Sequence, residues 1–244
     1  MTRNENVFLA KKLFTELVFN TAYIEGVNVT FPQTQAILDG AVVNNIPVSD
    51  IQTVLNLRDA WKFCLETLDE DVDLAYVCRL NGFVSRNESL DWGHLRSGQV
   101  YISGTEYIPP VPVEREVKTR LQSILDVEDP VDRAIECFCY TVRSQLFWDG
   151  NKRTATILAN RFLIAEGAGV LTIGKSDSVE FNTALLHYYD TSDAGPLKKN
   201  LRSCIKTLDA RQPMADRFAA AKAQAERHNN NRSSIDHTNH NIDR

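Results

Sequence analysis

The sequence has no long run of apolar residues and only five cysteines. No stretch approaches the roughly eighteen consecutive apolar residues that a membrane-spanning helix needs. The cysteines form no Cys-x-x-Cys pair and residues 1–5 begin no apolar signal segment, so we expect a protein of the reducing cytoplasm. Positive charge is not in excess, because the formal net charge is −5. This balance disfavours a general nucleic-acid or anionic-membrane surface, and any phosphate site must be local.

Helical periodicity dominates the chain. A length of 244 residues is enough for one body with a substantial core. Apolar residues recur at spacings of three and four, which predicts an all-α, mostly helical fold. The expected helices are an N-terminal one that stops near Gly26, and then 32–38, 49–68, 74–84, 113–125, 129–146, 151–166, 178–189 and 197–208. We divide the chain into 1–30, a core of 31–209, and 210–244, where polar composition predicts a C-terminal helix that fades into a disordered tail.

The helical pattern breaks near residues 93–110. Three glycines bracket the β-prone run Val100 to Ile102, and three prolines follow it. These signals predict a short extended segment or β-hairpin on the helical body. From periodicity alone, an ordinary edge strand explains the run equally well.

A polar turn separates two apolar helices at Asp149 to Arg153. Gly150 gives the backbone freedom, and the first amides of the second helix have no intrahelical acceptor, so they form a concavity suited to an anion. Arg153 opposes the helix dipole, which indicates that it faces an anion, and Asp149 beside a phosphate calls for a magnesium ion. Gln145 lies on the buried stripe of the first helix and should point into the body. Taken singly, the residues fit simple caps and a solvated pair; their combination favours a phosphate site.

Three segments of the sequence resemble one family. "FWDGNKR" resembles the core of the Fic motif, whose usual form is His-Pro-Phe-x-Asp/Glu-Gly-Asn-Gly-Arg-x-x-Arg. "SGQVYISGTEYIPP" resembles the flap hairpin of such proteins, and "TAYIEG" resembles the inhibitory helix of their self-restrained members. The resemblance covers about residues 6–208. It implies a helical Fic bundle with a short β-hairpin flap near 93–110 and an inhibitory helix within 1–30.

The resemblance also implies roles for matching residues. The family binds ATP or another nucleoside triphosphate with Mg²⁺ and modifies a Ser, Thr or Tyr hydroxyl of a target protein. Asp149 would bind the metal and Arg153 would clamp the outer phosphates. The phosphate cradle would comprise Gly150, Asn151 and Lys152; the inhibitory segment would comprise Thr21, Glu25 and Gly26; and the target would pair with the flap at Val100, Tyr101, Ile102 and Ser103.

The sequence departs from the family motif at three places. The family histidine, a base with a pKa near neutrality, falls on Gln145, whose amide cannot take a proton, so we expect impaired transfer. Lys152 and Thr156 replace the usual glycine and second arginine, as in the Doc branch, whose members act as protein kinases. Thr156 also removes the usual partner of Glu25, and we expect Arg153 to replace it. The alternative for Glu25 is an ordinary helix-ending residue.

Two functions follow, and the sequence leaves both open. The first is a self-inhibited transferase that moves AMP or phosphate from a nucleotide to a protein hydroxyl. The second is a pseudoenzyme that binds a nucleotide or a protein partner as a regulator or antitoxin-like subunit. A purely structural scaffold explains none of the polar turn. We expect no nucleic-acid or membrane partner, and the target, the nucleotide base and any homo-oligomer stay open.

Overall fold

The computed structural model describes residues 1–208, which form one helical unit. The helix and tail expected for 210–244 lie outside the described residues. Ten helices and one two-stranded sheet make up residues 1–208, which confirms the all-α expectation. They are α1 (Arg3–Lys12), α2 (Phe14–Tyr23), α3 (Phe31–Leu38), α4 (Val48–Glu66), α5 (Leu74–Val84), α6 (Glu114–Leu125), α7 (Pro130–Ser144), α8 (Asn151–Ala165), β1 (Val170–Leu171), α9 (Ser178–Thr191), α10 (Gly195–Ser203) and β2 (Ile205–Lys206).

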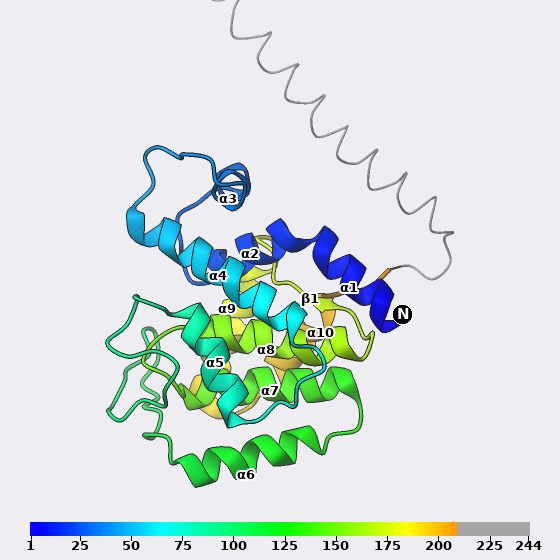
Figure 1. The fold of residues 1–244 in the computed structure, drawn as a ribbon. Helices are drawn as coiled ribbons and strands as arrows, with labels where there is room; N and C mark the ends of the chain where they lie inside the picture. Colours follow the sequence, from blue (N-terminus) through cyan, green and yellow to red (C-terminus); the bar gives the residue numbers. More distant parts are fainter. Residues whose placement is uncertain (209–244) are drawn as a thin grey trace, which may run out of the picture. The chain divides into compact units, whose positions relative to one another are not determined.

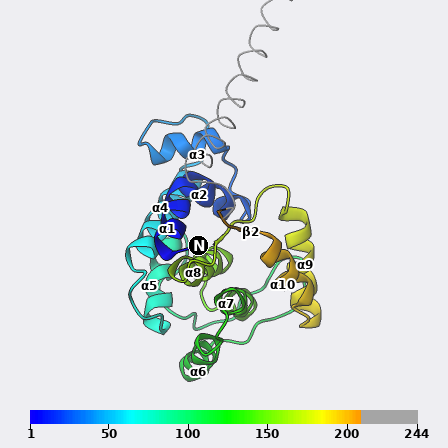
Figure 2. The same cartoon turned by 90° about the vertical axis from the view of Figure 1, so that its right-hand side faces the viewer.

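Helix α8 lies at the centre of the bundle. It packs along α7 and also contacts α1, α2, α4, α5 and β1, as Figures 1 and 2 show. Thirteen of its fifteen residues are buried, so its first turn is fixed by contacts on every side. Helix α7, expected over 129–146, begins with a side-chain cap from Asp129 and a first-turn proline. The turn between α7 and α8 is therefore held between two anchored helices.

The N-terminal segment forms two helices where the sequence predicted one. The chain changes direction at Leu13, whose backbone angles are φ −89° and ψ 6°. The break gives the two halves different main partners: α1 packs on α8 and β1, while α2 packs chiefly on α3 and α4 and makes a smaller contact with α8. Helix α2 then ends at Tyr23, and Gly26 follows in the left-handed region.

Most predicted helix boundaries differ from the observed ones by one or two residues, and the end of α10 differs by five. The helix expected to reach residue 208 stops at Ser203, because Ile205 and Lys206 pair antiparallel with Leu171 and Val170. Helix α4 starts at Val48, one residue ahead of the start predicted at residue 49, and no side chain caps it. In both places a tertiary contact or a preceding proline outweighs the local signal.

The flap segment 93–110 contains no strand, so the predicted β-hairpin was wrong in this respect. The chain turns at Ser103 and Gly104, the latter at φ +85°, but no ladder forms on either side. Prolines have no N–H to donate, and side chains occupy the carbonyl of Pro109. The segment is therefore extended and held by side chains instead of by strand pairing.

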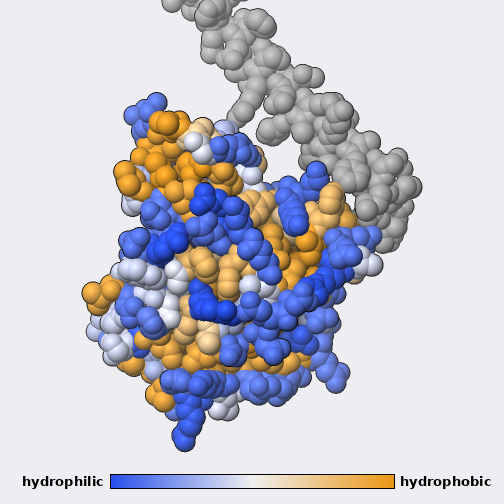
Figure 3. Space-filling model, in the orientation of Figure 1, coloured by the Kyte–Doolittle hydropathy of each residue, from blue (hydrophilic) through white to orange (hydrophobic). Residues whose placement is uncertain are grey.

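An apolar surface region covers α3 and the loop that follows it (Figure 3). Phe31, Val42 and Val48 are exposed there. No helix within residues 1–208 has the length and apolarity needed to cross a bilayer.

Candidate functional site

A cavity of about 550 Å³ brings together most of the residues that the sequence singled out. Its walls come from the end of α2, the flap, the turn between α7 and α8, and one face of α9. The lining residues are Glu25, Val100, Tyr101, Ile102, Ser103, Gln145, Trp148, Asp149, Gly150, Asn151, Lys152, Asn182, Leu185, Leu186 and Tyr189. Thr21, Gly26 and Arg153 are not among them.

The turn from α7 to α8 is rigid because two residues adopt the left-handed conformation. Gln145 ends α7 at φ 44°, and Gly150 starts α8 at φ 73°. A side chain at Gly150 would place its Cβ 2.8 Å from Val84 Cγ1, so only glycine fits without a shift. Asn81 of α5 donates to the carbonyl of Asp149 at 3.0 Å and fixes the outer side of the turn.

Gln145 is partly buried, and both ends of its amide are bonded. Its Nε2 donates to the carbonyl of Val142 at 2.7 Å and to Tyr189 Oη at 3.4 Å. Its Oε1 accepts from Asn151 Nδ2 at 3.0 Å. The sequence predicted that this side chain points into the body, although on the reasoning that it continues α7, which ends one residue earlier. An amide so placed can orient a neighbour but cannot act as a general base near neutral pH.

The first amides of α8 are available to an anion. No side chain caps this helix. Its first backbone hydrogen bond runs from the Thr154 N–H to the Gly150 carbonyl, so the amides before Thr154 have no partner within the helix. The Asn151 side chain is not a free ligand, since it bonds both the N–H and the carbonyl of Phe147. The cradle expected at Gly150, Asn151 and Lys152 could therefore be formed only by backbone N–H groups, and that of Gly150 already donates to Asp149 Oδ1. Lys152 adds its side-chain charge at the cavity wall.

Arg153 lies behind the cavity, 4% exposed, among three carboxylates. Its closest partner is Glu88 at 2.5 Å, followed by Asp149 at 3.2 Å and Glu25 at 4.0 Å. Burial opposes its charge, but Glu25, Glu88 and Asp149 outweigh burial and raise the pKa of Arg153 above its ordinary value. Its Nε has no hydrogen-bond partner within residues 1–208. The clamp role expected for Arg153 would require the guanidinium to leave these acids.

Glu88 was missed by the sequence reasoning. Its other carboxylate oxygen accepts from Asn56 Nδ2 of α4 at 2.7 Å, so α4 holds the acid against Arg153. Glu88 and Arg153 lie 65 residues apart, and neither spacing nor a motif links them. Only the packing of α4 and α5 against α8 reveals this pair.

The segment predicted to be inhibitory lies beside the cavity, and its acid, Glu25, contacts Lys152 more closely than Arg153. Lys152 Nζ is 3.3 Å from Glu25 Oε2 and donates to the carbonyl of Ile24 at 3.0 Å. We expected Arg153 to be the cation that pairs with Glu25. Arg153 does approach Glu25, but its contact of 4.0 Å is longer than that of Lys152. Thr21 is buried, bonded to the carbonyl of Leu17 and to Trp61 Nε1, so it supports α2 and does not reach the cavity.

Asp149 is the one acid of the turn that could bind a metal ion. It is half exposed on the cavity wall, and its Oδ1 accepts from the Gly150 N–H at 2.5 Å. No group of three or more metal-binding side chains occurs within residues 1–208. A single carboxylate fits Mg²⁺, which keeps several waters and is commonly bound through one or two carboxylates and the phosphates of a nucleotide.

The flap and α9 form the opposite walls. Tyr101 is 79% exposed at the cavity mouth, while Ile102 packs partly on the core. Tyr189 of α9 donates to the carbonyl of Val142, and burial raises its pKa above the ordinary value. The α9 residues Asn182, Leu185 and Leu186 were not singled out from the sequence, because their spacing indicates only that they share one face of a helix.

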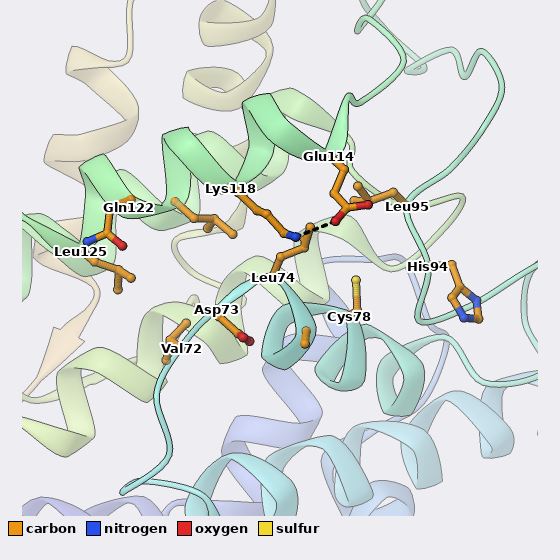
Figure 4. Close-up of a pocket in the computed structure, with 12 residues that line it drawn as sticks. Val72, Asp73, Leu74, Cys78, His94, Leu95, Glu114, Lys118, Gln122 and Leu125 are labelled. Atoms are coloured by element: carbon orange, nitrogen blue, oxygen red, sulfur yellow. Dashed lines mark ion pairs between the residues drawn. The ribbon is translucent and has the colours of Figure 1, made fainter.

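A larger cavity, about 740 Å³, lies away from this turn, between α5 and α6 (Figure 4). It contains the exposed ion pair between Lys118 and Glu114, at 2.6 Å, and leucines from both helices. His94 lies at its edge and contacts Asp91, so His94 does not replace the missing base at Gln145. None of the residues predicted for the phosphate site lines this cavity.

Comparison with known proteins agrees with this geometry. Residues 71–163, which span α5 to α8 with the flap and the turn, match the family model described as the Fic/DOC family. The chain is 26% identical over 213 residues to the protein adenylyltransferase Fic of Drosophila melanogaster, covering 82% of this chain and 42% of that protein. It is 25% identical over 189 residues to the protein adenylyltransferase fic-1 of Caenorhabditis elegans, covering 73% and 37%.

Solved structures show the same fold. A fragment of Fic-1 from C. elegans superposes with a TM-score of 0.67 at 24% identity, covering 78% of this chain and 59% of that one. A Fic domain containing signalling protein from Bacteroides thetaiotaomicron gives 0.66 at 20% identity, covering 80% and 83%. Residues 71–163 thus match the Fic/DOC family, and the chain has the helical fold of these Fic structures. It spans about two fifths of the length of the curated relatives it matches.

Proposed function

We propose that this protein binds a nucleoside triphosphate, ATP in the first instance, with Mg²⁺ in the cavity at the α7–α8 turn, and that it transfers AMP or phosphate to a protein hydroxyl slowly or not at all. The proposal rests on one observation: a single cavity is lined by the uncapped start of α8, the Asp149 carboxylate, Lys152 and the flap. Relatives named protein adenylyltransferases support AMP as the transferred group.

Each side chain then has a defined task. The amides at the start of α8 and the Lys152 ammonium would bind phosphate oxygens. Asp149 would hold Mg²⁺, which supplies positive charge to the phosphates when bound. The flap residues Val100 to Ser103 would hold an extended segment of the target through their unpaired backbone groups, which the absence of an internal ladder leaves exposed.

The transfer step itself needs a proton acceptor. For AMP transfer, the target hydroxyl oxygen bonds to the α-phosphorus, the bond from that phosphorus to the bridging oxygen breaks, and pyrophosphate leaves. The hydroxyl proton must go to a base, and Gln145 cannot accept it. General base catalysis contributes about two to four powers of ten, and the remaining rate would come from positioning and charge.

Inhibition would come from the carboxylates around the site. Glu25, Glu88 and Asp149 face only Lys152 and Arg153, which leaves one negative charge in excess. A triphosphate would approach against this charge unless Mg²⁺ binds or Glu25 moves. The inhibitory role of Glu25 therefore belongs to the proposal, with Lys152 as its nearest cation.

A second candidate, a pseudoenzyme that binds a nucleotide or a regulatory protein without catalysis, is favoured by one observation. The amide of Gln145 is bonded to Val142, Tyr189 and Asn151, so it is built into the turn as a structural group. The antitoxin-like role would be one form of this candidate.

Calorimetric titration with ATP, with and without Mg²⁺, tests the proposal. We expect Mg²⁺ to strengthen binding to the wild type, and Asp149→Asn to remove that gain. Glu114→Gln, which changes an acid in the other cavity, is the matched control and should bind as the wild type does. Binding that appears only in Glu25→Gly would still support the proposal and locate the restraint. If neither the wild type nor Glu25→Gly binds, the nucleotide site is refuted and a protein-binding pseudoenzyme remains.

A further inference from the structure

Arg96 is a buried cation that lacks an acidic partner within residues 1–208. It is 1% exposed, yet its hydrogen bonds all end on backbone carbonyls. Burial lowers the pKa of its guanidinium from the ordinary value. Arg153, the comparable buried arginine of the site, is instead surrounded by carboxylates. A charge buried in this way is costly unless its donors are satisfied, so the five carbonyl contacts are the reason it is tolerated.

These carbonyls belong to three separate segments. At the end of α7, Nε donates to the Gln145 carbonyl at 2.5 Å and Nη2 approaches that of Ser144 at 3.4 Å. At the start of the flap, Nη1 donates to Gly98 at 2.5 Å. At the end of the flap, Nη2 donates to Pro110 at 2.6 Å and Pro109 at 3.3 Å. One planar group thus joins both ends of the flap to the end of α7.

The backbone of the same region adds two contacts. The Arg96 N–H donates to the Leu146 carbonyl at 3.0 Å. Gly98 lies so close to the turn that a Cβ there would be 2.6 Å from the Trp148 ring. The start of the flap and the α7–α8 turn are therefore packed together, and Arg96 lies at the junction.

The segments that Arg96 contacts supply few donors of their own to these carbonyls; the exception is Gln99, which donates to Pro109. The last carbonyls of an α-helix have no intrahelical partner, and a cation near this end is favoured by the helix dipole. The prolines contribute no N–H, and the flap forms no ladder that could satisfy its carbonyls. A guanidinium has five donors in a fixed plane and can serve all three segments at once, whereas an ammonium cannot.

We infer that Arg96 is a positioning residue that fixes the flap relative to Gln145, so that a target segment on Val100 to Ser103 presents its hydroxyl at a constant place in the cavity. The coupling of flap and turn rests on the geometry alone. Its consequence for transfer rests on the proposed function.

Hydrogen exchange measured by mass spectrometry tests the coupling without any ligand. We expect Arg96→Ala to raise the exchange rate of amides in 97–108 and 145–148 by at least about tenfold, because several bonds to a charged donor are lost. Amides within α4 and α5 should keep wild-type rates. Arg161→Ala is the matched control: Arg161 is also buried and donates to a carbonyl, that of Glu70, far from the flap in sequence.

Two further measurements separate positioning from general support of the fold. Arg96→Lys keeps the positive charge but cannot reach three segments, so it should show the same local increase; it decides the question if Arg96→Ala does not fold. Methylguanidinium added to Arg96→Ala should slow flap exchange again and should not affect Arg161→Ala. Unchanged flap exchange in Arg96→Lys, or an equal increase throughout the chain, overturns the inference.

The catalytic consequence is measured in the Glu25→Gly, Gln145→His background. Adding Arg96→Lys should lower target modification by about tenfold while ATP affinity stays within about twofold, because the flap and not the phosphate cradle is displaced. A loss of ATP affinity of the same size as the loss of rate contradicts positioning. If the background variant itself transfers nothing, the proposed function fails, and hydrogen exchange still decides the role of Arg96.

Discussion

At the scale of single residues, the proposed slowing or loss of transfer rests on Gln145. Its backbone at φ 44° is in a region that histidine tolerates better than most residues, so a histidine can occupy this position without rebuilding the turn. Its neighbours Asn151 and Tyr189 already supply polar groups that could orient an imidazole. The surroundings of Gln145 are therefore compatible with a base that the sequence lacks.

We predict that Gln145→His combined with Glu25→Gly raises the transfer of labelled AMP from ATP to protein by about 10² to 10⁴, the usual contribution of a general base. The measurement is incorporation of label from α-labelled ATP into the protein itself or into a cell extract. Gln145→Asn in the same background is the control and should stay at the wild-type level. Equal labelling by the histidine and asparagine variants would remove the base from the explanation.

A second prediction concerns the pair of Lys152 and Glu25. With Glu25→Gln, Lys152 loses its nearest acid and is free to meet a phosphate, so ATP should bind about tenfold more tightly, as expected for one charge-assisted contact. Lys152→Ala should abolish this gain in the double variant. Calorimetry of the four proteins of this cycle gives the coupling between the two side chains.

The same cycle on Lys118 and Glu114 is the control for the Lys152 prediction, because that ion pair lies in the other cavity and is more exposed. Its coupling in ATP binding should be zero. Additive effects of Glu25→Gln and Lys152→Ala would show that Glu25 acts on the nucleotide directly and not through Lys152.

At the scale of elements, local sequence signals predicted helices well and the flap poorly. The range 74–84 and the start of α8 at Asn151 follow from periodicity and turn residues, which act over a few positions. The strands expected in 93–110 are absent because Arg96 and the prolines satisfy or remove the groups a ladder needs. The polar turn at Asp149 to Arg153 was visible in the sequence, whereas Glu88 was not, since it meets Arg153 only through packing.

The turn between α7 and α8 gives a prediction at this scale. Gly150→Ala should lower the free energy of unfolding by about 1 to 3 kcal/mol, since alanine is strained at φ +73° and its Cβ would clash with Val84. Gly26→Ala is a matched control, because Gly26 has φ +80° but nothing within 4 Å of its added Cβ. It should cost only the backbone strain, about 1 kcal/mol.

Urea unfolding measures both of these glycine variants. Adding Val84→Ala to Gly150→Ala removes the clash. The double variant should therefore be more stable than the sum of the two single losses predicts. If the Gly150 and Gly26 variants lose the same stability, the close approach of α5 to the turn does not restrict residue 150, and the rigidity argued for the cradle has another origin.

At the scale of the whole molecule, the core buries four free thiols, and three of them, Cys64, Cys137 and Cys139, give the fold a predictable response to alkali. Burial raises the pKa of Cys64, Cys137 and Cys139 from 9.0 to about 12. Between these values the unfolded chain releases thiol protons and the folded chain keeps them. The unfolded state therefore gains stability as pH rises above 9, and the stability that is present below pH 9 is lost progressively towards pH 12.

We predict that the free energy of unfolding, measured with urea under reducing conditions, falls between pH 9 and pH 10.5 with a slope of up to roughly 1.4 kcal/mol per pH unit for each of these thiols. Cys64→Ala should be less stable than the wild type at pH 7, because it leaves a cavity beside α8. The slope of its unfolding free energy against pH above pH 9 should be shallower than that of the wild type by the contribution of one thiol. Thr67→Val, a neighbouring change without a thiol, should keep the wild-type slope. Parallel curves for the wild type and Cys64→Ala above pH 9 would mean that Cys64 ionises equally in both states, and that this part of the core is open to water.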